Sequence, residues 1–132
     1  MKPLLIIFSL LISSFVLAQT KLITPQEFKI RIDTTTSYQI IDIRKPSEYA
    51  RGYLKGAINI NYYDKDFKEQ IARLDKSIPT FVYCHIAGRS GHSMKIFKSL
   101  GFKDVYDMNK GIVGWKKLNY PLIYPQQKSH SK

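Results

Sequence analysis

The stretch TFVYCHIAGRSGHSMKIFKSLG, residues 80–101, decides the fold, because it reads as a strand, a short loop and a helix. Residues 80–84 are mostly apolar and end at a cysteine, which is typical of a strand buried on both faces of a sheet. Residues 89–101 carry apolar side chains at helical spacing and end in a glycine, a common helix terminator. The inward-facing positions of this helix are expected to be Met94, Phe97 and Leu100.

The same alternation of strand and helix continues on both sides of this stretch. Because strands and helices alternate with short connections, we predict parallel strands joined by crossover helices. Helices must then cover both faces of the sheet. The expected fold is a three-layer α/β domain with about five parallel strands. Further strands are expected at residues 21–24, 38–43, 57–60 and 104–108, and further helices from Pro25 onward and at 47–52, 64–76 and 110–121.

Local signals support two of these helices. Thr24 has the properties of an N-cap, with Glu27 placed to complete a capping box. In the helix expected at 64–76, apolar side chains recur at positions i, i+4 and i+7, which forms one buried stripe. The stripe consists of Phe67, Ile71 and Leu74.

The amino-terminal residues have the pattern of a secretory signal peptide. Lys2 precedes an almost wholly apolar run at residues 4–16, and small side chains then favour cleavage after Ala18. The alternative is a retained membrane anchor. The apolar run is shorter than the roughly 20 residues that a spanning helix needs, so we favour cleavage.

Cleavage would leave one compact domain followed by a polar tail without apolar anchors, which we expect to be disordered. The mature protein is therefore expected in the periplasm or outside the cell, with no stable membrane anchor. The predicted organisation is a signal peptide at 1–18, a domain at 19–124 and a disordered tail at 125–132.

The chain is basic, with a formal net charge of +11, but its basic residues are scattered and form no run longer than Lys116-Lys117. We expect a solvated surface that attracts small anions, rather than a nucleic-acid partner. The three histidines, His85, His92 and His130, lack the spacing of metal ligands. No metal and no organic cofactor are expected.

Cys84 is the only cysteine. In an oxidising compartment a lone cysteine is either sheltered in the core or kept as a reactive thiol. Ligands of parallel α/β sheets bind beyond the carboxyl ends of strands, where Cys84 is expected. The free N–H groups of the following helix, the loop glycines and the charge of Arg89 all favour a negative sulfur. We therefore predict a nucleophile rather than an inert core cysteine.

Three segments resemble the rhodanese sulfurtransferases. The pattern C-x-x-x-G-R-S after FVY is similar to the active-site loop of that family. DIRKPSEYARGYLKGAINI, residues 42–60, resembles its upstream signature, and GFKDVYDMNKGIVGWKKLNYPL, residues 101–122, resembles its closing segment. The loop alone is a weak motif, whereas three segments in the right order are a specific one.

The resemblance implies a single rhodanese domain in which Cys84 accepts a sulfane sulfur as a persulfide and passes it on. Thiosulfate is the simplest donor, and cyanide, a small thiol or a protein thiol is the acceptor. Arg89 would stabilise negative charge, and the loop would cradle the donor. The substrate-binding residues implied are His85, Ile86, Ala87, Gly88, Arg89 and Ser90.

Loop length distinguishes this chemistry from that of similar phosphatases and arsenate reductases, whose loop is one residue longer. Cys84 to Arg89 spans six residues, which favours sulfur transfer. Two alternatives stay open: a cysteine-based phosphatase or arsenate reductase, and a rhodanese-like binding module without catalysis. The presence of both Cys84 and Arg89 argues against the second.

The chain departs from the family pattern at three positions. Ala87 and Lys110 stand where glycine is usual, and Tyr53 stands where histidine is common. If the backbone at Ala87 needs a positive φ, alanine costs about 1 kcal/mol there. The alternative is that Gly88 absorbs the turn.

Four charged residues lie upstream of the loop. Asp42 and Arg44 end a strand on the side of the site and are candidates for loop support, although we favour a structural ion pair or cap. Glu48 and Arg51 are expected on a solvated or capping face.

Four further residues have simpler interpretations. We do not favour His85 as a general base, because a thiolate that has already formed needs none. His92 is expected to pack or to face solvent. Tyr106 and Trp115 are expected in the core.

Overall fold

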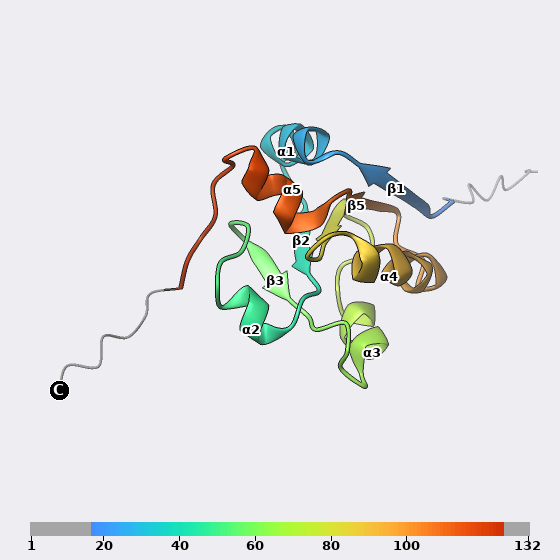
Figure 1. Cartoon of the computed structure of the whole chain (residues 1–132). Coiled ribbons are helices and arrows are strands. Elements are labelled where there is room, and N and C mark those ends of the chain that lie inside the picture. Colours follow the sequence, from blue (N-terminus) through green and yellow to red (C-terminus); the bar gives the residue numbers. More distant parts are fainter. Residues whose placement is uncertain (1–16, 126–132) are drawn as a thin grey trace, which may run out of the picture.

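The computed structural model describes residues 17–125 and contains a five-stranded sheet (Figure 1). Almost all of the expected signal peptide and tail therefore lies outside the described residues. The elements, in chain order, are β1 (Gln19–Ile23), α1 (Pro25–Thr34), β2 (Gln39–Asp42), α2 (Pro46–Tyr49), β3 (Ala57–Asn59), α3 (Phe67–Ala72), β4 (Thr80–Tyr83), α4 (Gly88–Ser99), β5 (Asp104–Met108) and α5 (Gly111–Lys117).

The strand order in the sheet is β1-β5-β4-β2-β3, and every pairing is parallel. The carboxyl ends of all five strands therefore meet at one edge. Because β4 lies at the centre of the sheet, the loop after it lies in the middle of that edge. The expected parallel architecture is confirmed.

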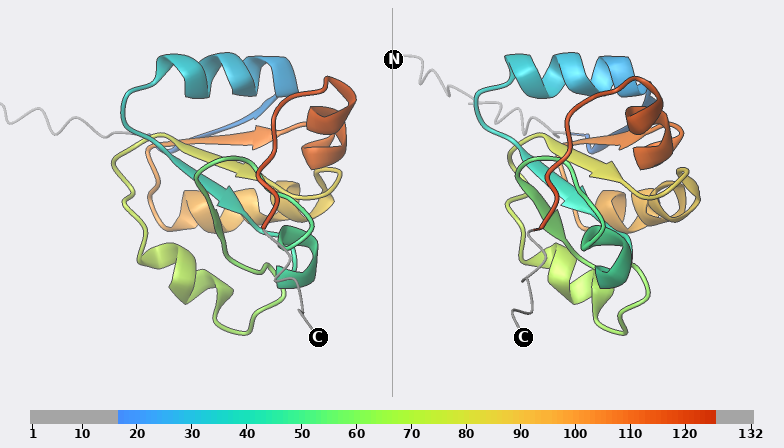
Figure 2. Two further views of the ribbon diagram at one scale, coloured as in Figure 1. Left: turned by 90° about the vertical axis from the view of Figure 1, so that its left-hand side faces the viewer. Right: turned by 60° about the vertical axis from the view of Figure 1, so that its left-hand side comes forward.

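Helices cover both faces of the sheet, with α1 and α5 on one side and α3 and α4 on the other (Figure 2). Each face has its own apolar cluster, and the buried stripes of the helices close these clusters. Phe28 of α1 and Trp115 of α5 belong to one cluster, and Phe67 of α3 and Phe97 of α4 belong to the other. The three predicted layers are thus present.

Tyr106 is only half-buried, which corrects the expectation that it lies in the core. Its ring stacks on Phe81 at a centroid distance of 5.0 Å, and the guanidinium of Arg31 lies over the ring at 4.6 Å. It forms the border of the core because its hydroxyl accepts a hydrogen bond from Arg31. Trp115, by contrast, is buried as expected.

The predicted capping box of α1 is only half formed. The Thr24 hydroxyl accepts a hydrogen bond from the N–H of Glu27 at 3.1 Å. The Glu27 carboxylate accepts two hydrogen bonds from Arg31, at 3.0 and 2.9 Å, instead of reaching back to Thr24. The arginine one turn along the helix competes successfully for the carboxylate because it offers a charged, two-bond contact.

The helix expected over 64–76 is shorter than predicted and spans only Phe67–Ala72. Asp64 instead forms a turn before it, accepting the N–H of Phe67 on its carbonyl at 3.1 Å and the amide of Asn61 on its carboxylate at 3.0 Å. Phe67 and Ile71 are buried, whereas Leu74 lies beyond the helix and is half-buried. None of the helices in residues 17–125 is long and apolar enough to cross a bilayer.

Candidate active site

Cys84 comes directly after β4 and opens the loop that leads into α4. Its Sγ accepts a hydrogen bond from the N–H of Ala87 at 3.1 Å and lies 3.5 Å from the Ser90 hydroxyl. The residue exposes only 1% of its surface. The thiol is therefore enclosed by the apolar cluster below it and by its own loop above it, with a backbone donor directed at the sulfur.

Ala87 closes this loop in a left-handed conformation, with φ 98° and ψ −6°. Gly88 is already the first residue of α4, so the alternative in which Gly88 absorbs the turn is wrong, and Ala87 itself has the positive φ. The Ala87 carbonyl accepts the Ser90 hydroxyl at 3.2 Å and the N–H of Gly91 at 2.9 Å. These bonds hold alanine in a conformation that costs it about 1 kcal/mol.

The start of α5 supports the loop from the other side. The N–H of Ile112 donates to the Cys84 carbonyl at 3.0 Å, and that of Val113 donates to the His85 carbonyl at 3.2 Å. Gly111 makes this approach possible, since a Cβ there would lie 2.4 Å from the His85 oxygen. Gly111 is visible in the sequence as a glycine of the closing segment. Its contact with the Cys84 loop was not predictable, because the two segments lie far apart in the chain.

Arg89 forms a two-bond ion pair with Glu48 of α2, with Nη1 and Nη2 donating at 2.7 and 2.8 Å. The hydrogen bonds from Arg89 lower the pKa of the Glu48 carboxyl to about 2. The same carboxylate accepts the N–H of Lys45 at 3.0 Å. Glu48 thus has the expected capping role. It also orients Arg89, and this second role was not predicted from the sequence.

Asp42 and Arg44 form a buried ion pair at 2.6 Å. Arg44 also donates to the Gly52 carbonyl at 2.8 Å, and Asn59 donates to both backbone carbonyls of the pair at 3.0 and 2.9 Å. The pair ties β2 to the segment that follows α2. The structural role that we favoured agrees with this geometry.

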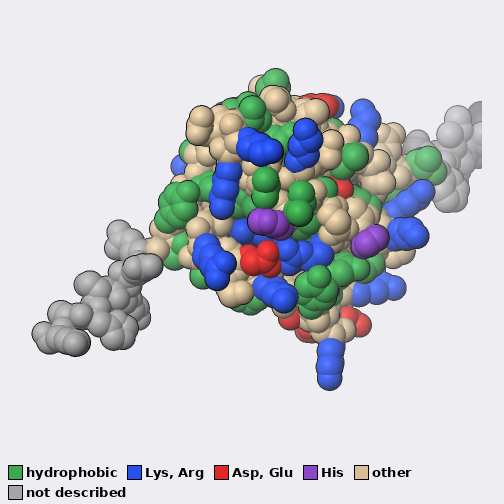
Figure 3. Space-filling view, viewed as in Figure 1, with side chains coloured by type: hydrophobic (Ala, Val, Ile, Leu, Met, Phe, Trp, Pro, Cys, Tyr) green, Lys and Arg blue, Asp and Glu red, His purple; other side chains and the backbone are tan. Residues whose placement is uncertain are grey.

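A cavity of about 340 Å³ lies beside the loop and is lined by Arg44, Glu48, Arg51, His85 and Lys116. Three permanent cations and one carboxylate make this opening favourable to anions. On the face shown in Figure 3, Lys and Arg side chains likewise gather with a histidine around an acidic patch. Arg51, which we expected on a solvated or capping face, is exposed and also borders this cavity.

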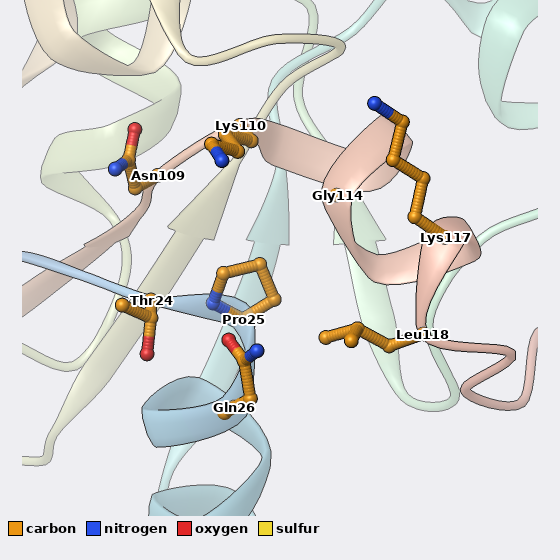
Figure 4. Close-up of a pocket in the computed structure, with 8 residues that line it drawn as sticks. All are labelled: Thr24, Pro25, Gln26, Asn109, Lys110, Gly114, Lys117 and Leu118. Carbon is orange, nitrogen blue, oxygen red and sulfur yellow. The ribbon is translucent and has the colours of Figure 1, made fainter.

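A second cavity lies between α1 and α5, and Cys84 does not line it (Figure 4). Its lining residues are Thr24, Pro25, Gln26, Asn109, Lys110, Gly114, Lys117 and Leu118. Within residues 17–125 there is no group of three or more His, Cys, Asp or Glu side chains that could hold a metal ion. His85 and His92 are both exposed.

A family model for the rhodanese-like domain matches residues 24–118, from the cap of α1 to the end of α5. The chain belongs to this family. This rhodanese-like chain is 36% identical over 84 residues to the thiosulfate sulfurtransferase GlpE of Pseudomonas paraeruginosa, covering 63% of this chain and 73% of that protein. It is 30% identical over 107 residues to the uncharacterized protein YqhL of Bacillus subtilis, covering 80% of this chain and 81% of that one.

Two further comparisons concern a larger protein and a solved structure. The probable adenylyltransferase/sulfurtransferase MoeZ of Mycobacterium tuberculosis is 30% identical over 104 residues, which are 79% of this chain and only 26% of that protein. A rhodanese-related protein from Thermoplasma volcanium shares the fold, with a TM-score of 0.70, 24% identity, and coverage of 80% of this chain and 99% of that one. The chain is thus a rhodanese domain with sulfurtransferase relatives.

One residue near the loop of this rhodanese domain escaped sequence reasoning altogether. Asp107, on β5, is 3% exposed. Burial raises the pKa of its carboxyl to about 6, and the Ser90 hydroxyl partly opposes that rise. The sequence contains no hint of this, because an aspartate within a strand reads as a solvent-facing position until the packing of α4 is known.

Proposed function

We propose that this protein is a sulfurtransferase that carries a sulfane sulfur on Cys84 as a persulfide. The observation that carries the proposal is the position of Sγ at the end of a central strand, 3.1 Å from the N–H of Ala87 inside a six-residue loop. Parallel α/β sheets bind ligands at this edge. Relatives named thiosulfate sulfurtransferase support the same chemistry.

Thiosulfate is the donor that this site suits best. The Cys84 thiolate attacks the outer sulfur of thiosulfate, a new S–S bond forms at Sγ, and the S–S bond of thiosulfate breaks. Sulfite leaves with the electron pair of that bond. Cyanide, or the thiolate of an acceptor, then attacks the outer sulfur of the persulfide, and Sγ regains its electron pair. The reaction is a two-step transfer that needs no metal and no organic cofactor.

The enclosure of the sulfur supports small anions as substrates. With 1% of Cys84 exposed, a donor has to pass the loop, and a compact anion does so more readily than a bulky one. The basic residues around the neighbouring cavity attract such a donor. Two of the five N–H groups of Arg89 bind Glu48, so its charge and its remaining donors are available to the anion. A small thiol or an extended protein thiol serves as the acceptor.

We also propose that the protein is exported and acts in the periplasm or outside the cell. The sequence of residues 1–18 supports this. Cleavage after Ala18 would keep β1 whole, since that strand begins at Gln19 and the N–H of Gln19 donates to the Lys103 carbonyl at 2.9 Å. Amino-terminal sequencing of the protein recovered from outside the cytoplasm should begin at Gln19. A start at Met1 would contradict export by cleavage.

Sulfur transfer is tested with the purified protein. Thiosulfate should add one sulfur atom to the intact mass, and cyanide should remove it as thiocyanate. Cys84→Ser should lose both reactions while its thermal unfolding stays cooperative. An intact mass unchanged by thiosulfate, polysulfide and persulfide donors would contradict the proposal. Hydrolysis of a small aryl phosphate that depends on Cys84 would favour the phosphatase instead.

A further inference from the structure

The carboxyl of Asp107 is buried beside the first turn of α4, and the residue is only 3% exposed. Among the side chains of residues 17–125, Asp107 Oδ1 is the buried oxygen or nitrogen that has no hydrogen-bond partner. Burial raises the pKa of this carboxyl to about 6, and no charged side chain of the described residues contributes to the shift. The group is therefore mostly ionised at neutral pH, and a cation bound beside it would relieve the cost of its burial.

A cavity of about 350 Å³ adjoins this carboxyl and lies between the edge strand β1, the end of β5 and α4. Asp107 and Gly91 both line it. A Cβ at position 91 would lie 3.8 Å from Asp107 Oδ2. Because glycine has no side chain, the approach to this oxygen from the cavity stays open.

The side chains around the cavity are of two kinds. Three carry an oxygen that accepts hydrogen bonds, and three are apolar. The acceptors belong to Thr20, Asp107 and Asn109, and the apolar side chains are those of Leu22, Ala87 and Met94. A primary ammonium group has three N–H donors and no acceptor, so it matches the three oxygens. An alkyl chain attached to it matches the apolar side chains.

Lys21 also borders the cavity, but its side chain does not compensate the carboxylate. In the parallel register of β1 and β5, Leu22 is paired with Asp107. Lys21 is paired with Tyr106, whose ring packs against the apolar cluster of α1 and α5. Successive side chains of a strand point to opposite faces, so Lys21 points away from the face that carries Asp107. Its backbone, at the edge of the sheet, is the part that borders the cavity.

A metal ion matches this lining less well than an organic cation does. Calcium takes about six to eight oxygen ligands, and magnesium needs a nearly ideal octahedron. The cavity offers one carboxylate and two neutral side-chain acceptors. Within residues 17–125 no three His, Cys, Asp or Glu side chains come together as a metal site would require.

We propose that this cavity binds a small alkylammonium ion, with the Asp107 carboxylate as its counter-ion. The ammonium group donates to Asp107 Oδ2, and the alkyl chain lies along Leu22 and Met94. The volume of about 350 Å³ suits a chain of about four carbons. This site is separate from the cavity beside His85, and binding there requires no step of sulfur transfer.

Binding is tested by titrating the purified protein with butylammonium chloride at neutral pH. The amide resonances of Ala87, Gly91 and Asn109, followed by NMR, should shift and saturate. The dissociation constant should be in the millimolar range, since so small a ligand has few atoms with which to bind. Sodium chloride at the same concentrations should not shift these resonances. 1-Butanol, which has the same chain without the charge, should bind at least about tenfold more weakly.

Two variants test the roles of the carboxylate and the apolar side chains. Asp107→Asn should weaken butylammonium binding about tenfold or more, whereas Asp104→Asn, at the other end of β5, should leave it unchanged. Met94→Ala should weaken the binding of butylammonium more than that of methylammonium, because only the longer chain reaches the apolar side chains.

The ammonium group can come from a free amine or from a lysine side chain of a peptide. Nα-acetyl-lysine methylamide carries the same butylammonium group on a peptide unit and distinguishes the two sources. If it binds as tightly as butylammonium, the site accepts a lysine side chain. Saturable binding of butylammonium alone assigns the site to free amines.

Three results would overturn the proposal. They are equal binding of butylammonium and 1-butanol, equal shifts with sodium chloride, and unchanged butylammonium binding in Asp107→Asn. None of these measurements involves Cys84 or a sulfur donor. Failure of the ammonium site would therefore leave the proposed sulfur transfer untouched, and a protein without sulfur transfer would still bind butylammonium.

Discussion

Arg89 and Glu48 are joined by two hydrogen bonds of 2.7 and 2.8 Å, which link the Cys84 loop to α2. Their side chains are 17% and 25% exposed, so the pair is largely sheltered from water. The contact orients the positive charge of the loop without consuming it, because a guanidinium has five donors and the carboxylate takes two of them. The loop is thereby anchored on three sides, by α2, by α5 and by its own helix.

Removal of this carboxylate should weaken both stability and sulfur transfer. Glu48→Gln should lower the free energy of unfolding by about 1 kcal/mol at neutral pH, a value reduced for the partial exposure of the pair. The pKa of the Glu48 carboxyl is about 2 in the folded protein and 4.5 when the group is unperturbed, so its ionisation stabilises the fold at pH values above 4.5. This stabilisation is lost as the pH falls from 4.5 to about 2. Urea unfolding of both proteins at neutral and acidic pH measures this.

In acid the free energies of unfolding of the unaltered protein and of Glu48→Gln should become equal, because the Glu48 carboxyl of the unaltered protein is then protonated. Glu69→Gln, an exposed position on α3, is the matched control and should change little at either pH. A deficit that persists unchanged in strong acid would mean that the ion pair is not its cause.

Ala87→Gly should stabilise the protein. Glycine adopts a φ of 98° without the steric cost that alanine pays, although it loses more entropy on folding. We expect a net gain of about 0.5 kcal/mol in the free energy of unfolding, measured by chemical denaturation. Ala72→Gly, at the last position of α3, should instead lose up to about 1 kcal/mol. Equal losses in both variants would contradict a strained Ala87.

Gly111→Ala should damage both the fold and the site. Its Cβ would lie 2.4 Å from the His85 carbonyl oxygen and 2.6 Å from that of Cys84, so the loop or α5 has to move. We expect the free energy of unfolding to fall by about 3 kcal/mol or more, with strongly reduced sulfur transfer. Chemical denaturation and the thiocyanate assay measure the two effects.

The control for this variant is Gly56→Ala. Gly56 also has a positive φ, of 80°, but a Cβ there meets nothing within 4 Å. Its replacement should cost only the backbone strain, about 1 kcal/mol, and leave sulfur transfer intact. Similar losses in the two variants would show that the contact with the loop is not what position 111 requires.

Asp107→Asn should be more stable than the unaltered protein at neutral pH. Burial raises the pKa of Asp107, so the folded state binds a proton more tightly than the unfolded state and stability falls as the pH rises from 3.8 to about 6. The variant avoids this loss and should gain about 2 kcal/mol at neutral pH, but little in acid. Thermal unfolding on both sides of this pH range measures the difference. A variant equally stabilised at every pH would contradict the buried ionisation.

Much of the fold was predictable because its signals are local. The apolar run before Cys84 and the alternation of short strands with helices predicted the parallel sheet and its two covered faces, which the structure confirms. Element ends were less predictable, since they depend on competing partners. Glu27 binds Arg31 rather than completing its cap, and Asp64 forms a turn where a helix was expected.

The sequence by itself determined the sheet, the position of Cys84 at the end of a strand and the length of its loop, because periodicity and chain order fix these features. Only the tertiary structure decided which residues surround the sulfur. The pairing of Arg89 with Glu48, the approach of Gly111 and the burial of Asp107 each join segments that are distant in the chain. Whether Ala87 or Gly88 takes the left-handed turn was also decided there, because the hydrogen bonds of the closed loop outweigh the local preference of alanine.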